Sequence, residues 1–230
     1  MSDGGGDTNS LTQPPRRRLS FRHINALAIA AVLAASGVVP AADLAFVPLS
    51  FVYLHLFSVV AFPQLHPAPD PRVFSARDLR LLGAYVSASG VVSLLLPLAH
   101  ITDCVLAGDK DGVRVAAPHV FLLNAQIFLE GVIFSWGYSL PVFAFVPIFY
   151  NTRRLFTIFD WVAREGGRAK DGHAAARQVL AGRALAVANL CFWGFNLFGF
   201  LLPVYLPRVF KRYYSGHNNT TKAKDKSTTR

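Results

Sequence analysis

Long uncharged apolar runs, separated by short charged or proline-rich stretches, dominate the pattern of this chain. The longest run covers residues 184–207, ALAVANLCFWGFNLFGFLLPVYLP, and basic residues flank it on both sides. A hydrocarbon core of about 30 Å needs roughly 20 helical residues, so an uncharged run of this length predicts a transmembrane helix. Further runs predict four more spans, at residues 24–39, 44–62, 79–101 and 113–136.

The segment 138–150 is apolar, but it is short and contains two prolines. A helix of this length rises only about 20 Å, which is typical of re-entrant or interfacial segments. The next residues, 151–165, predict an interfacial amphipathic helix, because their apolar side chains recur at helical spacing. These side chains are Leu155, Ile158, Phe159 and Val162.

The pattern as a whole predicts an all-α polytopic transmembrane bundle of about five spans, within a range of four to six. The transmembrane domain covers residues 24–207. Residues 1–23 and 208–230 are polar and basic, which predicts two disordered tails.

Composition supports the membrane interpretation. Hydrophobic residues make up 53% of the chain and charged residues only 16%, whereas soluble proteins carry roughly 25% charged residues. The net charge of +10 gathers at the ends of the apolar runs, where Lys and Arg meet anionic headgroups. We therefore expect the lipid bilayer to be the partner, together with other membrane proteins or a second copy of this chain, and we expect no nucleic acid.

Basic residues also predict orientation, because Lys and Arg mark the cytoplasmic side of a membrane protein. The N-terminal tail, residues 63–80 and residues 151–183 are all basic, so the N-terminus is expected in the cytoplasm. Five spans would then place the basic C-terminal tail outside, against the rule. Either the tail violates the rule, or 138–150 crosses and 151–183 violates it, or 184–207 folds back as a hairpin.

The C-terminal tail also holds Asn218 and Asn219, and both fit the N-x-T glycosylation pattern if the tail is luminal. The expected location is the endomembrane system, with the endoplasmic reticulum, the Golgi and the plasma membrane all open.

A polar stripe runs along the fourth predicted span. His119, Gln126 and Glu130 lie within about 40° of one another around a helix. An acid within a membrane usually faces the bundle interior or a water-filled cavity. The stripe is therefore either a proton or ion path, in which Glu130 titrates and His119 relays, or a set of interhelical hydrogen bonds.

Asn189 and Asn196 share one face of the last predicted span, seven residues apart. They could complete a polar site with Glu130 or pair helices. Two stripes of small residues predict close helix packing. They are Ala26, Ala30 and Ala34 in one run, and Gly83, Ser87 and Gly90 in another.

Motifs of catalysis are missing from the sequence. It has no Gly-rich phosphate loop, nucleophile elbow or H-E-x-x-H pattern, and its two cysteines, Cys104 and Cys191, form neither a zinc spacing nor a disulfide framework. We expect no catalytic residue, metal or cofactor, and a protein that is not an enzyme. Arg153 and Arg154, near Tyr150 and Trp161, predict an interfacial anchor that contacts lipid headgroups.

Three blocks carry a resemblance: APHVFLLNAQIFLEGV, VPIFYNTRRLFTIFDW and GRALAVANLCFWGFNLFGFLLPVYLPRVFKRYYSG. They resemble a plant-specific family of small multi-pass membrane proteins of unknown function, over residues 21–216. The resemblance implies a plant source and a membrane protein, but no activity. From the residues, the first hypothesis is a non-enzymatic scaffold, assembly or membrane-shaping component. The alternative is a small transporter or channel subunit that uses the stripe on the fourth span.

Overall fold

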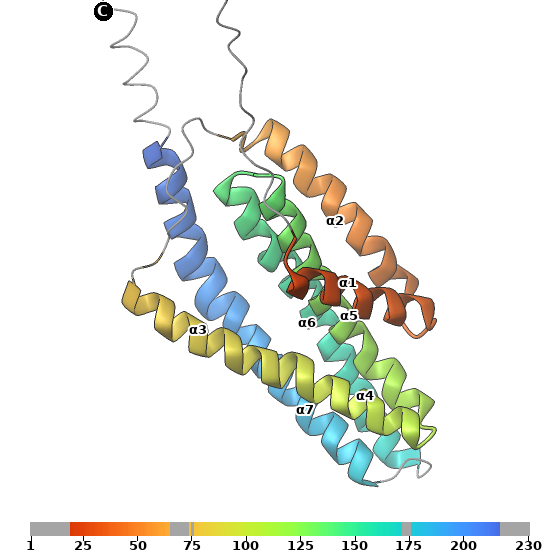
Figure 1. Cartoon of the computed structure of the whole chain (residues 1–230). Coiled ribbons are helices and arrows are strands. Elements are labelled where there is room, and N and C mark those ends of the chain that lie inside the picture. The colour runs from red at the N-terminus through yellow and green to blue at the C-terminus, as the bar shows by residue number, and fades with distance from the viewer. Residues whose placement is uncertain (1–18, 65–73, 75, 172–175, 217–230) are drawn as a thin grey trace, which may run out of the picture.

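The computed structural model describes residues 19–64, 74, 76–171 and 176–216, and this part of the chain contains helices and no strands. Figure 1 shows them as a tilted bundle. In chain order the helices are α1 (Phe21–Ala35), α2 (Ala41–Val60), α3 (Ala76–Gly90), η1 (Val91–Leu95), α4 (Leu96–Leu106), α5 (Lys110–Ser135), α6 (Leu140–Asp171), α7 (Ala176–Phe195) and η2 (Asn196–Tyr205).

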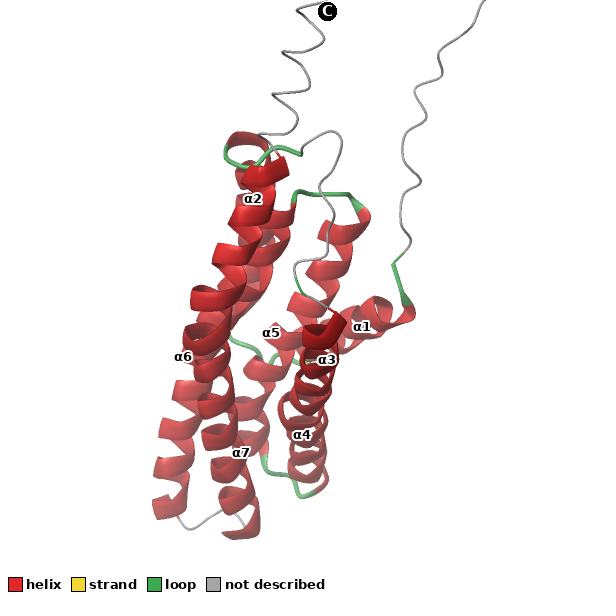
Figure 2. Cartoon of the chain, turned by 90° about the vertical axis from the view of Figure 1, so that its left-hand side faces the viewer, coloured by secondary structure: helices red, strands yellow, loops and turns green. Residues whose placement is uncertain are grey.

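Helix α5 forms the core of the molecule. It packs against α1, α4, α6 and α7, and its residues from Val115 to Gln126 are all buried. Helices α5, α6 and α7 run alternately up and down, and both views show α6 and α7 side by side (Figures 1 and 2). An apolar helix that is buried all round belongs in the interior of a bundle.

The predicted boundary at residue 150 is wrong, because α6 continues through it as one helix. The side chains that hold α6 against the core recur every three or four residues along its whole length. The fully buried members of this row are Val142, Val146, Tyr150, Arg154, Ile158, Trp161 and Glu165. The apolar face predicted to lie on a membrane surface therefore packs partly against protein, although Phe159 stays 63% exposed.

The last helix is also longer than predicted. It continues beyond η2 to Gly216, although residues 208–216 are polar and basic. Val209 and Tyr213 are buried there, and the Tyr213 hydroxyl donates to the Pro63 carbonyl over 2.8 Å. Residues 1–18 and 217–230, with most of the two predicted tails, lie outside the described residues.

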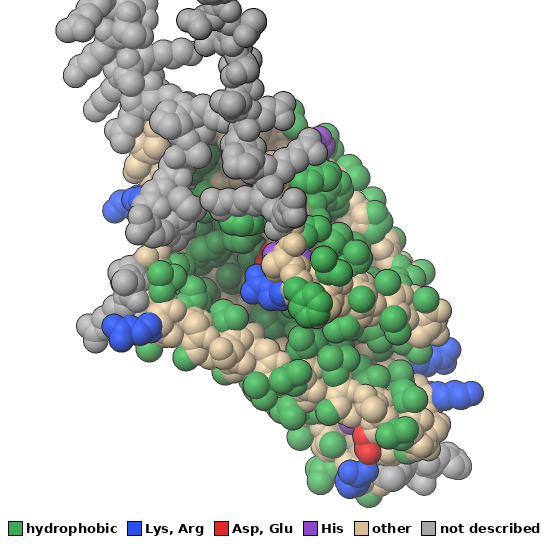
Figure 3. All heavy atoms as spheres, viewed as in Figure 1, with side chains coloured by type: hydrophobic (Ala, Val, Ile, Leu, Met, Phe, Trp, Pro, Cys, Tyr) green, Lys and Arg blue, Asp and Glu red, His purple; other side chains and the backbone are tan. Residues whose placement is uncertain are grey.

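Four described helical segments are long and apolar enough to cross a membrane: Ala41–Val60, Asp78–Leu106, Lys110–Ser135 and Ala176–Gly216. Apolar side chains cover much of the visible face in Figure 3. The outer faces of α2 and α3 expose large apolar side chains, such as Val60, which is 81% exposed, and Leu81, which is 70% exposed. These properties are compatible with a membrane location. The first predicted span corresponds to α1, which has only 15 residues.

The two stripes of small residues have different surroundings. Ala26 and Ala30 are buried in the contact between α1 and α5, as the first stripe predicts. In the second stripe, a Cβ atom added to Gly83 or Gly90 would meet nothing within 4 Å. That face of α3 is thus uncovered within the described part of the chain.

Candidate functional site

Glu130, Gln126 and Arg154 form a hydrogen-bonded chain that links α5 to α6. Gln126 Nε2 donates to Glu130 Oε1 over 2.8 Å, and Arg154 Nη1 donates to Gln126 Oε1 over 3.0 Å. The Gln126 amide therefore lies between a guanidinium group and a carboxyl group, with its carbonyl toward the first and its NH₂ group toward the second. Arg154 Cζ also lies 3.7 Å from the centre of a Trp193 ring in α7, a favourable cation–π contact.

Arg154 does not lie where a headgroup contact requires it. Its side chain is fully buried, so the prediction of a lipid anchor at this residue is wrong. The neighbouring Arg153 points elsewhere and pairs with the buried Asp43 of α2, with 2.8 Å between Nε and Oδ1. Adjacent residues on a helix point about 100° apart, which explains why two consecutive arginines have separate partners.

His119 and Asn189 meet at η1, where the backbone changes from α- to π-helical hydrogen bonding. His119 Nε2 lies 3.0 Å from the Ser93 carbonyl oxygen, and Asn189 Nδ2 donates to the Val92 carbonyl over 3.1 Å. A carbonyl oxygen only accepts, so Nε2 carries the proton of the His119 ring. These two side chains clamp α5 and α7 to the π-helical turn.

Asn196, at the start of η2, has a partner of its own. It accepts a hydrogen bond from the Tyr85 hydroxyl over 2.9 Å, which joins α3 to the last helix. The structure therefore brings Gln126 and Glu130 together and joins His119 with Asn189 through η1, but it places Asn196 in a separate contact. Asn218 and Asn219 lie outside the described residues.

Sequence reasoning missed Asn151. Its Nδ2 donates to the Trp193 carbonyl over 3.3 Å, and the residue is fully buried. The signal was available, because Asn151 precedes Arg154 by three residues and thus shares its helical face.

A comparison of the chain with protein-family models found a match. The model described as a domain of unknown function, DUF7733, matches residues 19–214. The chain belongs to the DUF7733 family. No curated protein and no solved structure matches it.

This DUF7733 chain has a second polar cluster, at the end of the bundle where α4 turns into α5. Arg168 donates to Asp109, and its Nη1 also donates to Glu165 Oε1 over 2.7 Å. His100 and Gly182 lie beside them: a Cβ added to Gly182 would lie 2.6 Å from Glu165 Oε1 and 3.0 Å from His100 Nε2. Helix α7 thus approaches the cluster closely because residue 182 has no side chain. The packing of α6 against the α4–α5 turn and α7 forms this cluster, and the sequence pattern did not predict it.

Asp109 and Glu165 both contact Arg168, but the pKa values of their carboxyl groups shift in opposite directions. Burial raises the pKa of Glu165 above its usual value, and Arg168 opposes this only in part. Burial also acts on Asp109, but there the Gly112 N–H, 2.9 Å from Oδ1, and Arg168 together outweigh it and lower the pKa. Asp109 is therefore the charged partner of Arg168, whereas Glu165 favours its neutral form more than an exposed glutamate would.

Both clusters in this DUF7733 chain are built from side chains of more than one helix or turn. Among the described residues, no group of His, Cys, Asp and Glu is arranged to hold a metal ion. Cys104 Sγ lies 3.7 Å from His100 Nε2, but the cysteine is fully buried. What both clusters do is join helices: the first joins α5, α6 and α7, and the second joins α6 to the α4–α5 turn.

Proposed function

We propose that this protein is a non-enzymatic component of a membrane, acting as a scaffold, assembly or membrane-shaping protein. The observation that carries the proposal is the fully buried Arg154, whose guanidinium contacts α5 through Gln126 and α7 through Trp193. A cation in such a site has fixed partners in two helices, so it holds the bundle in one arrangement. The bare apolar faces of α2 and α3 are then available to lipid or to other membrane proteins.

A small transporter or channel subunit is the second candidate function. It is favoured by Glu130, which is only partly buried and lies within the electrostatic influence of both Arg22 and Arg154. An acid at the edge of a polar chain that leads into the bundle could accept a proton from outside it.

Replacing Glu130 by Gln separates the two candidates. If the protein is a scaffold, Glu130→Gln keeps the hydrogen bond to Gln126 and should change the melting temperature of the purified protein little. Proteoliposomes of wild type and variant should then show equal, background proton flux, measured with a pH-sensitive dye inside the vesicles. Flux that is present in the wild type and lost in a folded variant would favour the transporter and contradict the scaffold.

We also propose that both termini face the cytoplasm, with an even number of crossings between them. Phe62, at the end of α2, stacks on Phe210, with 5.5 Å between ring centres, and its carbonyl accepts from Ser139. The end of α2, the α5–α6 turn and the end of the last helix therefore lie together. The start of α1 lies near the same end, because His23 contacts Gly131 toward the end of α5.

The basic residues support this orientation. The N-terminal tail, residues 63–80 and the segment from Arg208 onward hold 14 of the 23 Lys and Arg residues. This is the second of the three alternatives left open above, with α6 crossing the membrane and residues 151–183 breaking the rule. We propose an endomembrane location in this orientation.

Glycosylation mapping in microsomes tests the orientation. We expect no endoglycosidase-sensitive mobility shift from Asn218 and Asn219, or from an acceptor appended beyond residue 230. An acceptor inserted on a spacer within residues 172–175 should be modified. The double variant Asn218→Gln/Asn219→Gln is the control for the native sites. A shift of the appended acceptor would put the C-terminal tail in the lumen and contradict the even number of crossings.

A further inference from the structure

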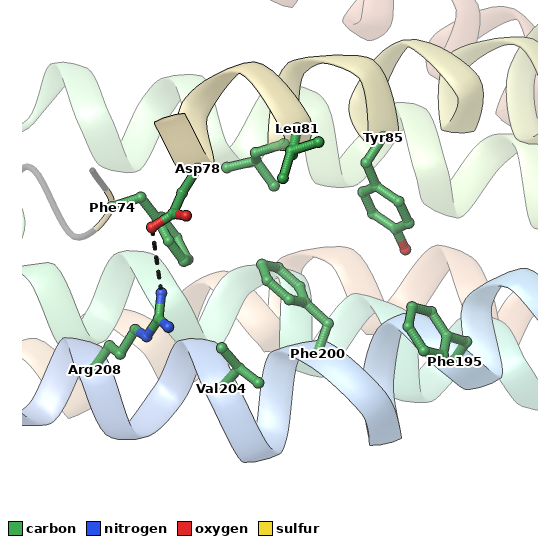
Figure 4. A pocket seen from close by; sticks show the side chains of 9 residues that line it. Phe74, Asp78, Leu81, Tyr85, Phe195, Phe200, Val204 and Arg208 are labelled. Atoms are coloured by element: carbon green, nitrogen blue, oxygen red, sulfur yellow. Dashed lines mark ion pairs between the residues drawn. The ribbon is translucent and has the colours of Figure 1, made fainter. Parts of the chain in front are cut away.

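A cavity of about 240 Å³ opens between α3 and η2, where these helices face each other (Figure 4). Most of its lining is apolar or aromatic: Phe74, Leu81, Leu82, Tyr85, Phe195, Phe200 and Val204. A dry cavity of about 150 Å³ with such a lining accepts benzene, so this larger one has room for a segment of hydrocarbon chain. Ordinary lipid-facing helices are convex, whereas this surface is concave.

Opposite charges lie together at one end of the cavity. The Asp78 Oδ2 and Arg208 Nη1 atoms are 4.0 Å apart, and the side chains are 46% and 50% exposed. Figure 4 shows them at the end of the cavity beside Phe74. Arg208 Cζ also lies 5.2 Å from the centre of the Phe74 ring.

The position of this pair matches the edge of a bilayer. Arg208 is the first charged residue after the uncharged run 184–207, and Asp78 lies in the first turn of α3. Next to them, Phe74 stacks on Phe200 and Tyr205, and aromatic side chains gather at membrane interfaces. From Asp78 to Tyr85, the cavity follows α3 for about 10 Å toward the middle of the membrane.

We propose that this cavity binds one zwitterionic glycerophospholipid of the surrounding bilayer. Arg208 contacts the phosphate, Asp78 contacts the ammonium group, and part of one acyl chain lies along Leu81 and Val204. A headgroup with adjacent negative and positive charges complements the adjacent Arg208 and Asp78, whereas an anionic headgroup would meet Asp78 without a matching charge. This lipid site is independent of the scaffold role proposed above and requires only that the chain lies in a bilayer.

Native mass spectrometry of the full-length protein in detergent tests the lipid site. Added dioleoyl-phosphatidylcholine should bind at one copy per protein, more tightly than dioleoyl-phosphatidylglycerol. Arg208→Gln should weaken phosphatidylcholine binding about tenfold, because it removes a charge-assisted contact to the phosphate. The matched control is Lys211→Gln on the same helix, which does not line the cavity and should leave binding unchanged. Asp78→Asn should reduce the preference for phosphatidylcholine over phosphatidylglycerol.

Filling the cavity gives an independent readout. Val204→Trp and Leu81→Trp insert an indole from opposite walls, and either variant that keeps the wild-type melting temperature should lose the bound phosphatidylcholine. Leu81 is exposed, so its variant is expected to fold even if Val204→Trp does not. Undiminished binding in a folded Trp variant would overturn the proposal. So would equal binding of the two lipids by the wild type, or a dimer whose formation excludes the lipid.

Discussion

Replacing Arg154 by Leu should destabilise the bundle by about 3 kcal/mol, at the upper end of what leaving a buried hydrogen-bonding group without its partner costs. The variant leaves the Gln126 carbonyl without its donor and removes the contact with Trp193. Glu130 keeps its hydrogen bond from Gln126 in this variant, so the acid adds little to the cost. Thermal unfolding of the detergent-solubilised protein, followed by tryptophan fluorescence, measures the loss.

Two further variants give this measurement its controls. Arg164→Leu removes an exposed arginine from the same helix and should change stability by less than about 0.5 kcal/mol. Arg154→Lys keeps the charge but loses the planar fork of donors, so it should lie between wild type and Arg154→Leu. A melting temperature for Arg154→Leu equal to that of Arg164→Leu would mean that the polar chain does not hold the helices together.

Enlarging Gly182 should be the second most damaging change. A Cβ there would lie 2.6 Å from Glu165 Oε1, and this carboxyl group cannot easily move because Arg168 holds it. Overpacking a well-packed interior costs about 1–3 kcal/mol, so we expect Gly182→Val to lower stability by about 2 kcal/mol.

Gly83→Ala is the matched control for Gly182→Val, and it should act in the opposite direction. A Cβ at Gly83 meets nothing within 4 Å, and alanine in a helix interior is favoured over glycine by roughly 0.5–1 kcal/mol. The melting temperature of Gly83→Ala should therefore equal or exceed that of the wild type. If the two variants shifted it equally, the close approach of α7 to Glu165 would not matter for stability.

Helical periodicity predicted which face of α5 carries Gln126 and Glu130, and the two side chains do bond to each other. Periodicity cannot say which helix supplies the third partner, and so Arg154 was assigned to the membrane surface. The apolar segment 138–150 is short on its own, which predicts a re-entrant or interfacial segment followed by a separate amphipathic helix. Buried polar partners on other helices allow one helix to continue through residues 151–154, but those partners are a property of the tertiary structure.

The partners of His119 and Asn189 were equally hidden from the sequence. Both form hydrogen bonds with backbone carbonyls of η1. Every residue has such a carbonyl, so the sequence does not show which one accepts. The same holds for Gly182, because the residues next to it in the sequence do not show that the Glu165 carboxyl group of α6 lies against it.

Helix α6 is longer than a bilayer's hydrocarbon layer is thick. Its 32 residues extend about 48 Å, whereas the hydrocarbon layer is about 30 Å thick. In the orientation proposed above, α6 starts beside the end of α2, so its last turns and the adjoining part of α7 would lie beyond the hydrocarbon layer as a short helical stub. The cluster of Asp109, Glu165 and Arg168 lies at this stub and ties it to the α4–α5 turn. In that orientation, this folded stub would be the part of the protein that water-soluble molecules can contact on the side opposite its C-terminus.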